Sequence, residues 1–290
     1  MSTPFRHVAL FGKYQAQGVR PILEEIAQFL VRCGVEVSVD RDTAMSSGWT
    51  DFGALSMDEM AQACDLAVVV GGDGTMLGIG RELARHNIPL IGINQGRLGF
   101  FTDIPSTDWR GALAPMIDGN FEQESRSMIE GGVWRDGEQI FQGFALNDVV
   151  VRSINPSMIE LRVTVGGDLV ANLRCDGMIV ATPTGSTAYA LSAGGPILHP
   201  DIAGWAMVPV ASHTLSNRPI VLPDDLEVVA ELVQGKEASA NFDMQSFASL
   251  LPHDQVRMQR SRHKARFLHP RGWSYYATLR QKLHWHAGSI

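Results

Sequence analysis

The chain has 290 residues, of which 45% are hydrophobic and 19% are charged. This balance fits two ordinary globular domains or one large one, and it excludes disordered and fibrous proteins. The 24 basic and 31 acidic residues give a net charge of −7 without a basic block, so no nucleic-acid surface is expected. No apolar run reaches the about 18 residues of a membrane span, residues 1–7 lack a signal pattern, and the three scattered cysteines form no framework. These features predict a cytoplasmic protein with no membrane partner.

Residues 1–125 alternate between strand-like and helix-like patterns. The short apolar run at residues 8–11 is typical of a strand. Apolar spacing over residues 22–30 predicts a helix, which Gly34 would end. Residues 35–39 alternate as Val-Glu-Val-Ser-Val, which predicts a strand with one exposed face.

A buried strand follows a short helix in the next part of the chain. Residues 56–59 have the spacing of a capping box, which predicts a short helix ending near residue 64. The continuous apolar run at residues 66–70 is typical of a strand buried on both faces of a parallel sheet. After the glycine-rich residues 71–75 we expect a helix to about residue 86 and a strand at residues 90–93. This βαβ unit predicts an α/β domain with a parallel sheet in Rossmann-like layers.

From residue 126 to residue 269 the pattern changes to short strands separated by turns, which predicts an all-β, sandwich-like domain. Helical spacing returns at residues 275–285, and we expect the C-terminal segment, residues 270–290, to pack back on the N-terminal domain. The expected strands of the second domain are residues 133–134, 139–144, 159–165, 169–173, 178–181, 206–210, 220–222, 226–232, 256–259 and 265–268.

A glycine-rich segment joins the buried strand to the helix that follows it. Open α/β sheets bind their ligands at this position. Gly71 and Gly72 allow a tight turn, Gly74 lets a phosphate approach the backbone, and Asp73 projects a carboxylate into the loop that ends at Thr75. An ordinary glycine turn is the alternative. The chain has no GxxxxGKS or GxxxxGKT sequence and lacks the third glycine of the dinucleotide fingerprint, so a P-loop protein is excluded and a hydride-transfer enzyme is disfavoured.

The polar pair Asn147 and Asp148 lies between two apolar runs. Such a pair is either a turn or a site. A carboxylate can accept hydrogen bonds from both hydroxyls of a ribose, while the neighbouring amide reads a base edge or a sugar oxygen.

Residues 176–196 are the richest segment in small and hydroxyl-bearing side chains. Tyr189 offers a flat face for an adenine, and Gly194 and Gly195 allow close approach of a ligand or of another backbone. A small-residue turn between sheets is the alternative. The hydroxyl residues expected to supply donors to a ligand are Thr182, Thr184, Ser186 and Thr187.

Four segments of this sequence together resemble the NAD kinase family. They are GGDGT at 71–75, INQGRLGF at 93–100, ALNDVVV at 145–151 and DGMIVATPTGSTAYALSAGGPI at 176–197. Lipid kinases and phosphofructokinases carry relatives of the first segment, but the four in this order are specific to NAD kinases. The similarity runs from the first strand to about residue 245.

The resemblance implies transfer of the γ-phosphoryl group of ATP to the 2′-hydroxyl of the adenosine ribose of NAD, which gives NADP. NAD and ATP are then the partners, and ATP brings Mg²⁺ or another divalent cation, with no metal held by the protein itself. Asp73 matches the catalytic proton acceptor of the family. A carboxylate is a poor base for a hydroxyl group, so an acceptor that orients the oxygen is sufficient. The family usually forms homo-dimers or homo-tetramers.

The resemblance also assigns the binding residues. The ATP phosphate loop is Gly71, Gly72, Gly74 and Thr75. The NAD-binding residues are Asp73, Gly74, Asn147, Asp148, Arg174, Asp176, Thr187, Ala188, Tyr189, Ala190, Leu191, Ser192 and Gln245.

The sequence departs from the family pattern at two positions. The family frequently has Asp-Gly-Gln where this chain has Asp243-Met244-Gln245, which leaves the local backbone open. Ser157 stands where relatives often have a basic residue.

Two other functions use part of the same motif set. A lipid or sphingoid-base kinase shares the GGDGT loop, but it should present an apolar or basic amphipathic stretch for a membrane, and none is visible. A non-catalytic NAD(P)-binding regulator would need Asn147, Asp148 and Tyr189 but not Asp73.

Overall fold

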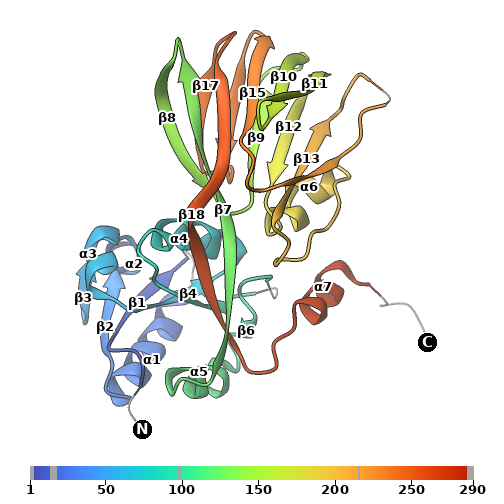
Figure 1. Ribbon diagram of the computed structural model, residues 1–290. Helices are drawn as coiled ribbons and strands as arrows, with labels where there is room; N and C mark the ends of the chain where they lie inside the picture. The colour runs from blue at the N-terminus through green and yellow to red at the C-terminus, as the bar shows by residue number, and fades with distance from the viewer. Residues whose placement is uncertain (1–2, 14–17, 97–98, 215, 286–290) are drawn as a thin grey trace. The chain divides into compact units, whose positions relative to one another are not determined.

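The computed structural model describes residues 3–13, 18–96, 99–214 and 216–285 (Figure 1). The chain divides into unit 1, residues 1–125 with 265–290, and unit 2, residues 126–264. Two residues of the INQGRLGF segment, Arg97 and Leu98, lie outside the described residues, as do residues 286–290. No helix in the described part is long and apolar enough to cross a membrane.

Unit 1 is built on a parallel sheet in the order β5-β4-β1-β2-β3, with β6 paired to β5. The last part of β18 (Gln255–Pro270) also pairs parallel to β5, with Phe267 opposite Leu90. The strands of unit 1 are β1 (His7–Gly12), β2 (Glu36–Asp40), β3 (Gly53–Leu55), β4 (Leu66–Gly71), β5 (Leu90–Asn94) and β6 (Ile104–Pro105). The helices are α1 (Val19–Arg32), α2 (Arg41–Ser47), α3 (Met57–Ala63), α4 (Asp73–Ala84), α5 (Trp109–Ile117) and α7 (Tyr275–Leu283).

Local signals account for the main elements of unit 1. Every residue of β4 is buried, as its apolar run predicts. Ser56 caps α3 and Glu59 completes the capping box. Alternate residues of the strands, such as Val68, pack against α1 and α5 in one core, and Figure 1 shows α4 on the other face of the sheet.

The expectation of one exposed face on β2 is wrong. Val37, Ser38 and Val39 are all buried, and the hydroxyl of Ser38, on the face expected to be exposed, lies 2.9 Å from Nε2 of His7. The sequence pattern did not reveal the short β3 or the helix α2 that follow it.

Unit 2 is a sandwich of two sheets. One sheet has the order β14-β13-β12-β9-β16-β17, with every pairing antiparallel. The other contains β11, β10, β15, the first part of β18 and the β7–β8 hairpin. The strands are β7 (Phe121–Arg135), β8 (Glu138–Ala145), β9 (Asp148–Ser153), β10 (Ile159–Val165), β11 (Asp168–Cys175), β12 (Gly177–Ala181), β13 (Gly204–Val210), β14 (Ile220–Pro223), β15 (Val228–Gln234), β16 (Ala238–Phe242) and β17 (Ser246–Leu250).

Apolar side chains of both sheets form one core in unit 2. Trp205 and Phe242 are fully buried in it, together with inward residues of β9, β10 and β12. The opposite face of the β14–β17 sheet carries a smaller cluster that includes Ala190 and Leu198. The 3₁₀ turn Gly185–Thr187 and the short helix α6 (Tyr189–Ser192) therefore cover the outside of the sandwich.

The expectation of two separate strands at residues 256–259 and 265–268 is wrong, because both belong to the single long strand β18. The helix expected at residues 275–285 is α7, whose buried Tyr275 and Leu279 make it part of unit 1. The predicted fold class is confirmed, including the return of the C-terminal segment to the α/β domain.

Candidate active site

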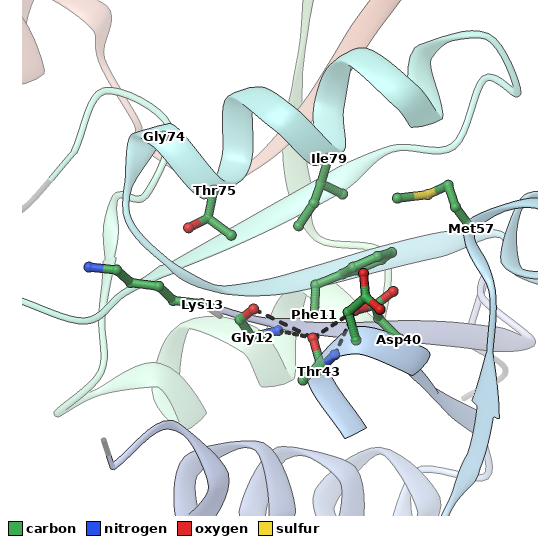
Figure 2. A pocket seen from close by; sticks show the side chains of 10 residues that line it. Phe11, Gly12, Lys13, Asp40, Thr43, Met57, Gly74, Thr75 and Ile79 are labelled. Carbon is green, nitrogen blue, oxygen red and sulfur yellow. Dashed lines mark hydrogen bonds between the residues drawn. The ribbon is translucent and has the colours of Figure 1, made fainter. Parts of the chain in front are cut away.

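The carboxyl ends of the parallel strands of unit 1 form one edge of the sheet, where α/β folds bind ligands. A cavity of about 480 Å³ opens at this edge (Figure 2). Its lining comes from the ends of β1 and β2 and from the first turns of α4. The lining residues are Phe11, Gly12, Lys13, Asp40, Asp42, Thr43, Met57, Gly74, Thr75 and Ile79.

A hydrogen-bond network fixes one wall of this cavity. Asp40 caps α2, and its Oδ2 accepts from the N–H and the hydroxyl of Thr43, both at 2.9 Å. The Thr43 hydroxyl in turn accepts from the N–H of Gly12 at 3.1 Å. Burial raises the pKa of Asp40 by more than these hydrogen bonds lower it. Lys13 also lines the cavity, so groups of both charge signs surround it.

Asp73 occupies the first turn of α4, directly after the extended residue Gly72. Its two carboxylate oxygens have different partners on the segment after β5. Oδ2 accepts from the N–H of Phe100 at 2.7 Å, and Oδ1 accepts from the N–H of Phe101 at 3.0 Å. Oδ1 also lies 3.4 Å from the hydroxyl of Thr102, which can donate to it. The sequence predicts a carboxylate that projects alone into a loop, but the protein backbone holds this one.

The close approach of this segment to Asp73 depends on a glycine. A side chain at Gly99 would overlap the Asp73 carboxylate and the Thr102 hydroxyl. The amide of Asn94 donates to Thr102 at 2.9 Å, which ties the segment to the end of β5. Asp73 and the GGDGT loop are thus brought together with part of the INQGRLGF segment, and the orientation of the carboxylate is fixed.

In unit 2, Asn147 and Asp148 immediately precede and begin β9, and a third residue holds their backbone. The carboxylate of Asp243 accepts from three consecutive N–H groups: Leu146 at 2.8 Å, Asn147 at 2.8 Å and Asp148 at 3.2 Å. The N–H of Asp243 donates to the carbonyl of Asp148 at 3.0 Å. This arrangement fixes the predicted pair rigidly at the edge of the β14–β17 sheet.

The carboxylate of Asp148 is only 3% exposed. Burial, followed by the negative charge of Asp243, raises the pKa of Asp148 to about 7. Within the described part of the chain no hydrogen bond to its carboxylate offsets these two causes. A buried carboxylate with a pKa far above its ordinary range in a polar site is a candidate for ligand binding.

The turn that carries Asp243 has an unusual backbone. Asp243 and Met244 have φ values of 53° and 54°, and the N–H of Gln245 donates to the carbonyl of Phe242 at 3.0 Å. Two consecutive positive φ values define a type I′ hairpin turn, which favours glycine at the second position. Met244 therefore adopts the left-handed conformation that the usual glycine of the family motif adopts easily.

Three hydroxyl groups of residues 182–187 donate to backbone carbonyl groups of unit 2. Thr182 donates to the carbonyl of Leu146 at 2.6 Å, and Ser186 donates to that of Pro183 at 2.6 Å. Thr187 donates to the carbonyl of Thr184 at 3.1 Å. Short polar side chains commonly bond to nearby backbone in turns, and here they shape the loop beside Asn147.

Most of the other predicted NAD-binding residues of unit 2 are exposed or partly exposed, but Ala190 is fully buried in the cluster with Leu198. Tyr189 is 39% exposed and starts α6, so its ring is accessible. Arg174 is the penultimate residue of β11 and lies opposite Glu160, with 4.0 Å between Nε and Oε1, and Asp176, directly after β11, is exposed. Gln245 is exposed in the turn with Met244.

Sequence reasoning missed two groups of residues in the site. Asp243 was visible only as part of a variant motif, and its role in holding the backbone of residues 146–148 had no local signal. Arg126 donates to the Thr184 hydroxyl at 3.3 Å from a buried position. Its neighbours in β7, Ser125 and Ser127, are polar and not buried, so no local pattern marks Arg126 as a buried residue.

The fold and the site define the chain as a nucleotide-dependent kinase of the α/β-plus-β-sandwich type. Two family models match it: the ATP-NAD kinase N-terminal domain over residues 8–121 and the ATP-NAD kinase C-terminal domain over residues 146–270. The chain therefore belongs to the NAD kinase family, and it is a kinase that acts on NAD.

Full-length relatives agree with this assignment. The chain is 60% identical over 295 residues to an NAD kinase of Methylibium petroleiphilum, covering 100% of this chain and 98% of the relative. It is 59% identical over 289 residues to an NAD kinase of a Polaromonas species, covering 99% of each chain. The lipid-kinase and regulator alternatives lose their support, because they rested on sharing only part of the motif set.

Solved structures with the same fold include two kinases. A yeast NADH kinase complexed with NADH has a TM-score of 0.90 at 22% identity, covering 99% of this chain and 90% of its own. An NAD kinase from Archaeoglobus fulgidus in complex with ATP has a TM-score of 0.76 at 27% identity, covering 96% of this chain and 98% of its own.

Proposed function

We propose that this protein transfers the γ-phosphoryl group of ATP to the 2′-hydroxyl of the adenosine ribose of NAD, and so produces NADP. The observation that carries the proposal is the fixed Asp73 carboxylate at the ligand-binding edge of the unit 1 sheet, in a chain of the NAD kinase family. Relatives that are 59–60% identical over the full chain are named NAD kinase.

We assign Asp73 the role of orienting the accepting hydroxyl group. A loose phosphoryl-transfer transition state leaves the hydroxyl proton in place until late, so a strong base is not required. A carboxylate that two backbone N–H groups hold still can accept that proton in a fixed direction. The contribution of Asp73 is then positional: the bond from the 2′-oxygen to the γ-phosphorus forms as the bond from that phosphorus to the β-phosphate oxygen breaks, ADP leaves, and the hydroxyl proton passes through the Asp73 carboxylate to solvent.

The phosphate loop Gly71, Gly72, Gly74 and Thr75 is proposed to bind ATP at the cavity of Figure 2. The partial positive charge of a helix N-terminus, here the start of α4, attracts phosphate oxygens. Mg²⁺ enters with ATP as part of the substrate, and the Asp42 carboxylate and Thr75 hydroxyl at the cavity are oxygen ligands of the kind it accepts. A divalent cation bound at this cavity would neutralise part of the negative charge of the ATP phosphates. The described residues contain no group of three or more histidine, cysteine or acidic side chains arranged to hold a metal.

Unit 2 is proposed to bind NAD. Asp148 would accept hydrogen bonds from ribose hydroxyls, Asn147 would contact the adenosine and Tyr189 would pack against its base. The remaining proposed contacts are Asp73, Gly74, Arg174, Asp176, Thr187, Ala188, Ala190, Leu191, Ser192 and Gln245.

The reaction is tested by incubating purified protein with Mg-ATP and NAD and measuring NADP with an NADP-specific dehydrogenase. Polyphosphate and NADH replace ATP and NAD in parallel assays. Asp73→Asn keeps the shape of the side chain but removes its charge, and we expect kcat to fall by roughly 10²- to 10⁴-fold with little change in NAD affinity. Asp58→Asn is the matched control, since Asp58 is an exposed aspartate in the first turn of α3.

Absence of NADP from the folded wild-type protein in every assay would refute the proposed reaction. A loss in Asp73→Asn confined to KM would instead show that this carboxylate contributes to ground-state binding alone.

Two further proposals concern the location of the protein in the cell and its oligomeric state. We propose a cytoplasmic location, which the three free cysteines support; cell fractionation tests it. We propose a homo-dimer or homo-tetramer, supported by Phe247, which is 69% exposed on the edge strand β17, and light scattering of the purified protein tests it.

A further inference from the structure

A buried histidine in unit 1 lies between two carboxylates. His269, near the end of β18, is 1% exposed. Its Nδ1 lies 3.0 Å from Oδ2 of Asp103, and its Nε2 lies 3.5 Å from Oε2 of Glu124. The imidazole stacks on the indole of Trp273, with ring centroids 4.0 Å apart and an angle of 9° between the planes.

The charges of this cluster favour the imidazolium form of His269. A protonated imidazole has two N–H groups, of which the one on Nδ1 donates to Asp103 and the one on Nε2 faces Glu124 at 3.5 Å as an ion pair, whereas the neutral ring has only one N–H. Burial lowers the pKa of His269, but the hydrogen bonds and charges of Asp103 and Glu124 outweigh it, so the pKa is raised overall. Loss of the proton would leave two nearly buried carboxylates facing a neutral ring, which is costly in a low-dielectric interior.

The same cluster connects directly to the segment that holds Asp73. Asp103 follows Thr102, and Phe100, Phe101 and Thr102 all contact the Asp73 carboxylate. The C-terminal part of β18 contacts this segment at two points.

The two contacts come from residues two apart on the strand, which share one face of it. Phe267 stacks on Phe101, with ring centroids 4.6 Å apart, and His269 bonds to Asp103. A third contact comes from α7, where Nζ of Lys282 lies 5.8 Å from the ring centroid of Phe100.

We propose that His269 is a positioning residue for the Asp73 carboxylate: its imidazolium anchors Asp103 and thereby fixes the two backbone N–H groups that orient Asp73. This inference rests on the proposed catalytic role of Asp73. It makes the C-terminal segment part of the catalytic apparatus, although no residue of that segment contacts the carboxylate in the described structure.

The geometry argues against a metal site at this cluster. The two carboxylates contact opposite nitrogens of the ring, so the three side chains cannot direct their donor atoms at one ion. The remaining alternative is that the cluster only stabilises the fold. In that case substitution of His269 would leave the kcat of the folded enzyme unchanged, whereas the proposal predicts a lower kcat.

The test compares His269→Phe and His269→Gln with the wild-type enzyme. Phenylalanine retains burial and stacking on Trp273 but makes no polar contact, and glutamine retains one N–H donor for Asp103. We expect kcat to fall by roughly 10- to 100-fold in His269→Phe and by less in His269→Gln, with the KM values for NAD and ATP within about twofold of wild type. The matched control is His253→Gln, because His253 also lies near a carboxylate, 3.6 Å from Glu231, but is exposed and remote from Asp73 in sequence.

A pH profile separates positioning from general stability. The kcat of the wild-type enzyme should fall as the pH rises above the raised pKa of His269, since the second N–H donor to Asp103 and Glu124 is then lost. His269→Gln should lack this fall, and His253→Gln should retain it. A folded His269→Gln enzyme with the kcat and pH profile of wild type would overturn the proposal.

Amide hydrogen exchange tests whether His269 anchors residues 99–103, and it does so without a measurement of activity. In His269→Phe, or in His269→Gln if the first variant does not fold, the amides of residues 99–103 should exchange at least about tenfold faster while the rest of unit 1 keeps its protection. Unchanged exchange there would overturn the proposal even if the wild-type enzyme proved to make no NADP. A wild-type protein without activity but with faster exchange in the variant would refute the proposed reaction and leave the anchoring role supported.

Discussion

The substitution Asp148→Asn should stabilise the folded protein while weakening NAD binding. Asp148 is buried beside Asp243, and its pKa is raised from an ordinary value of 3.8 to about 7. Asparagine has nearly the same shape and carries no charge at any pH. The variant therefore removes the cost of burying an ionised carboxylate without leaving a void.

The sign and size of the effect follow from proton linkage. Because the pKa of Asp148 is higher in the folded state, the folded protein binds more protons than the unfolded chain between about pH 4 and about pH 7. The stabilising contribution of this group is complete below the unfolded pKa and is lost as the pH rises through the folded pKa. A shift of about three units at about 1.4 kcal/mol each gives about 4 kcal/mol.

The free energy of unfolding of Asp148→Asn should thus exceed that of wild type by a gap that grows with pH. The gap should be near zero at about pH 4, rise by about 1.4 kcal/mol per pH unit, and level off above about pH 7. Urea unfolding followed by circular dichroism at several pH values measures it. A gap that is independent of pH, or a variant less stable than wild type at about pH 8, would refute the reasoning.

Asp254→Asn is a control in which the sign is opposite. Asp254 is also buried, but the hydrogen bonds of Arg135 at 2.7 and 2.9 Å and of the Leu251 N–H outweigh burial and lower its pKa. Its stabilising contribution exists above the unfolded pKa and is lost as the pH falls through the folded value. Asp254→Asn should therefore destabilise the protein most at neutral pH and least in acid.

The second part of the Asp148 prediction concerns the affinity of the enzyme for NAD. If the ionised Asp148 accepts hydrogen bonds from ribose hydroxyls, kcat/KM for NAD in the wild-type enzyme should rise with pH through about 7. Asp148→Asn should lower NAD affinity by roughly 10- to 100-fold, the worth of a charge-assisted hydrogen bond of about 1.5–3 kcal/mol. Calorimetric titration with NAD measures it, and wild-type affinity in the variant would exclude Asp148 from the binding site.

Two more substitutions test the backbone of unit 2. Met244→Gly should raise the free energy of unfolding by about 1 kcal/mol, because it relieves the left-handed conformation of an exposed side chain, and Met244→Ala should gain nothing because it keeps the Cβ. Gly185→Ala places a methyl group against the backbone of Asn147, so thermal unfolding should show a loss of about 1–3 kcal/mol and titration a loss of NAD affinity. Gly53→Ala is its control, since the added methyl meets nothing nearer than 3.8 Å, and equal losses in the two alanine variants would contradict the explanation.

The sequence predicts the elements whose causes are local. The buried strand β4 follows from its continuous apolar run, and α3 follows from the capping box at Ser56. Each of these signals lies within a few residues of the element it creates, so no knowledge of the tertiary structure is needed. The loop expected over residues 71–75 is shorter in the structure, because Gly71 ends β4 and Asp73 begins α4, so that Gly72 alone connects them.

The contacts that complete the site join residues distant in sequence, and periodicity does not reveal them. Phe100 binds Asp73 across 27 positions, and the Leu146 N–H binds Asp243 across 97. His269 reaches Asp103 across 166 positions. The resemblance to NAD kinases identified Asp73 as important but carried no information about the groups that hold it.

The hydroxyl-rich loop shows a different limit of sequence reasoning. Composition alone indicates donors, but it does not say whether a ligand or the backbone accepts from them. In the structure, Thr182, Ser186 and Thr187 donate to carbonyl groups within unit 2. These hydrogen bonds fix the shape of the loop.

Four carboxylates at these two sites differ in how the protein neutralises them, and the difference indicates where a ligand is needed. Asp73 has two backbone N–H donors, Asp243 has three, and Asp103 has the imidazole of His269. Among these four carboxylates, that of Asp148 is the one for which no hydrogen bond in the described part of the chain offsets the effect of burial on the pKa. A group held in an unfavourable state in the free protein gains most when a ligand supplies the missing donor. The ribose hydroxyls of NAD are such donors, so the stability lost at Asp148 is the expected counterpart of affinity for NAD.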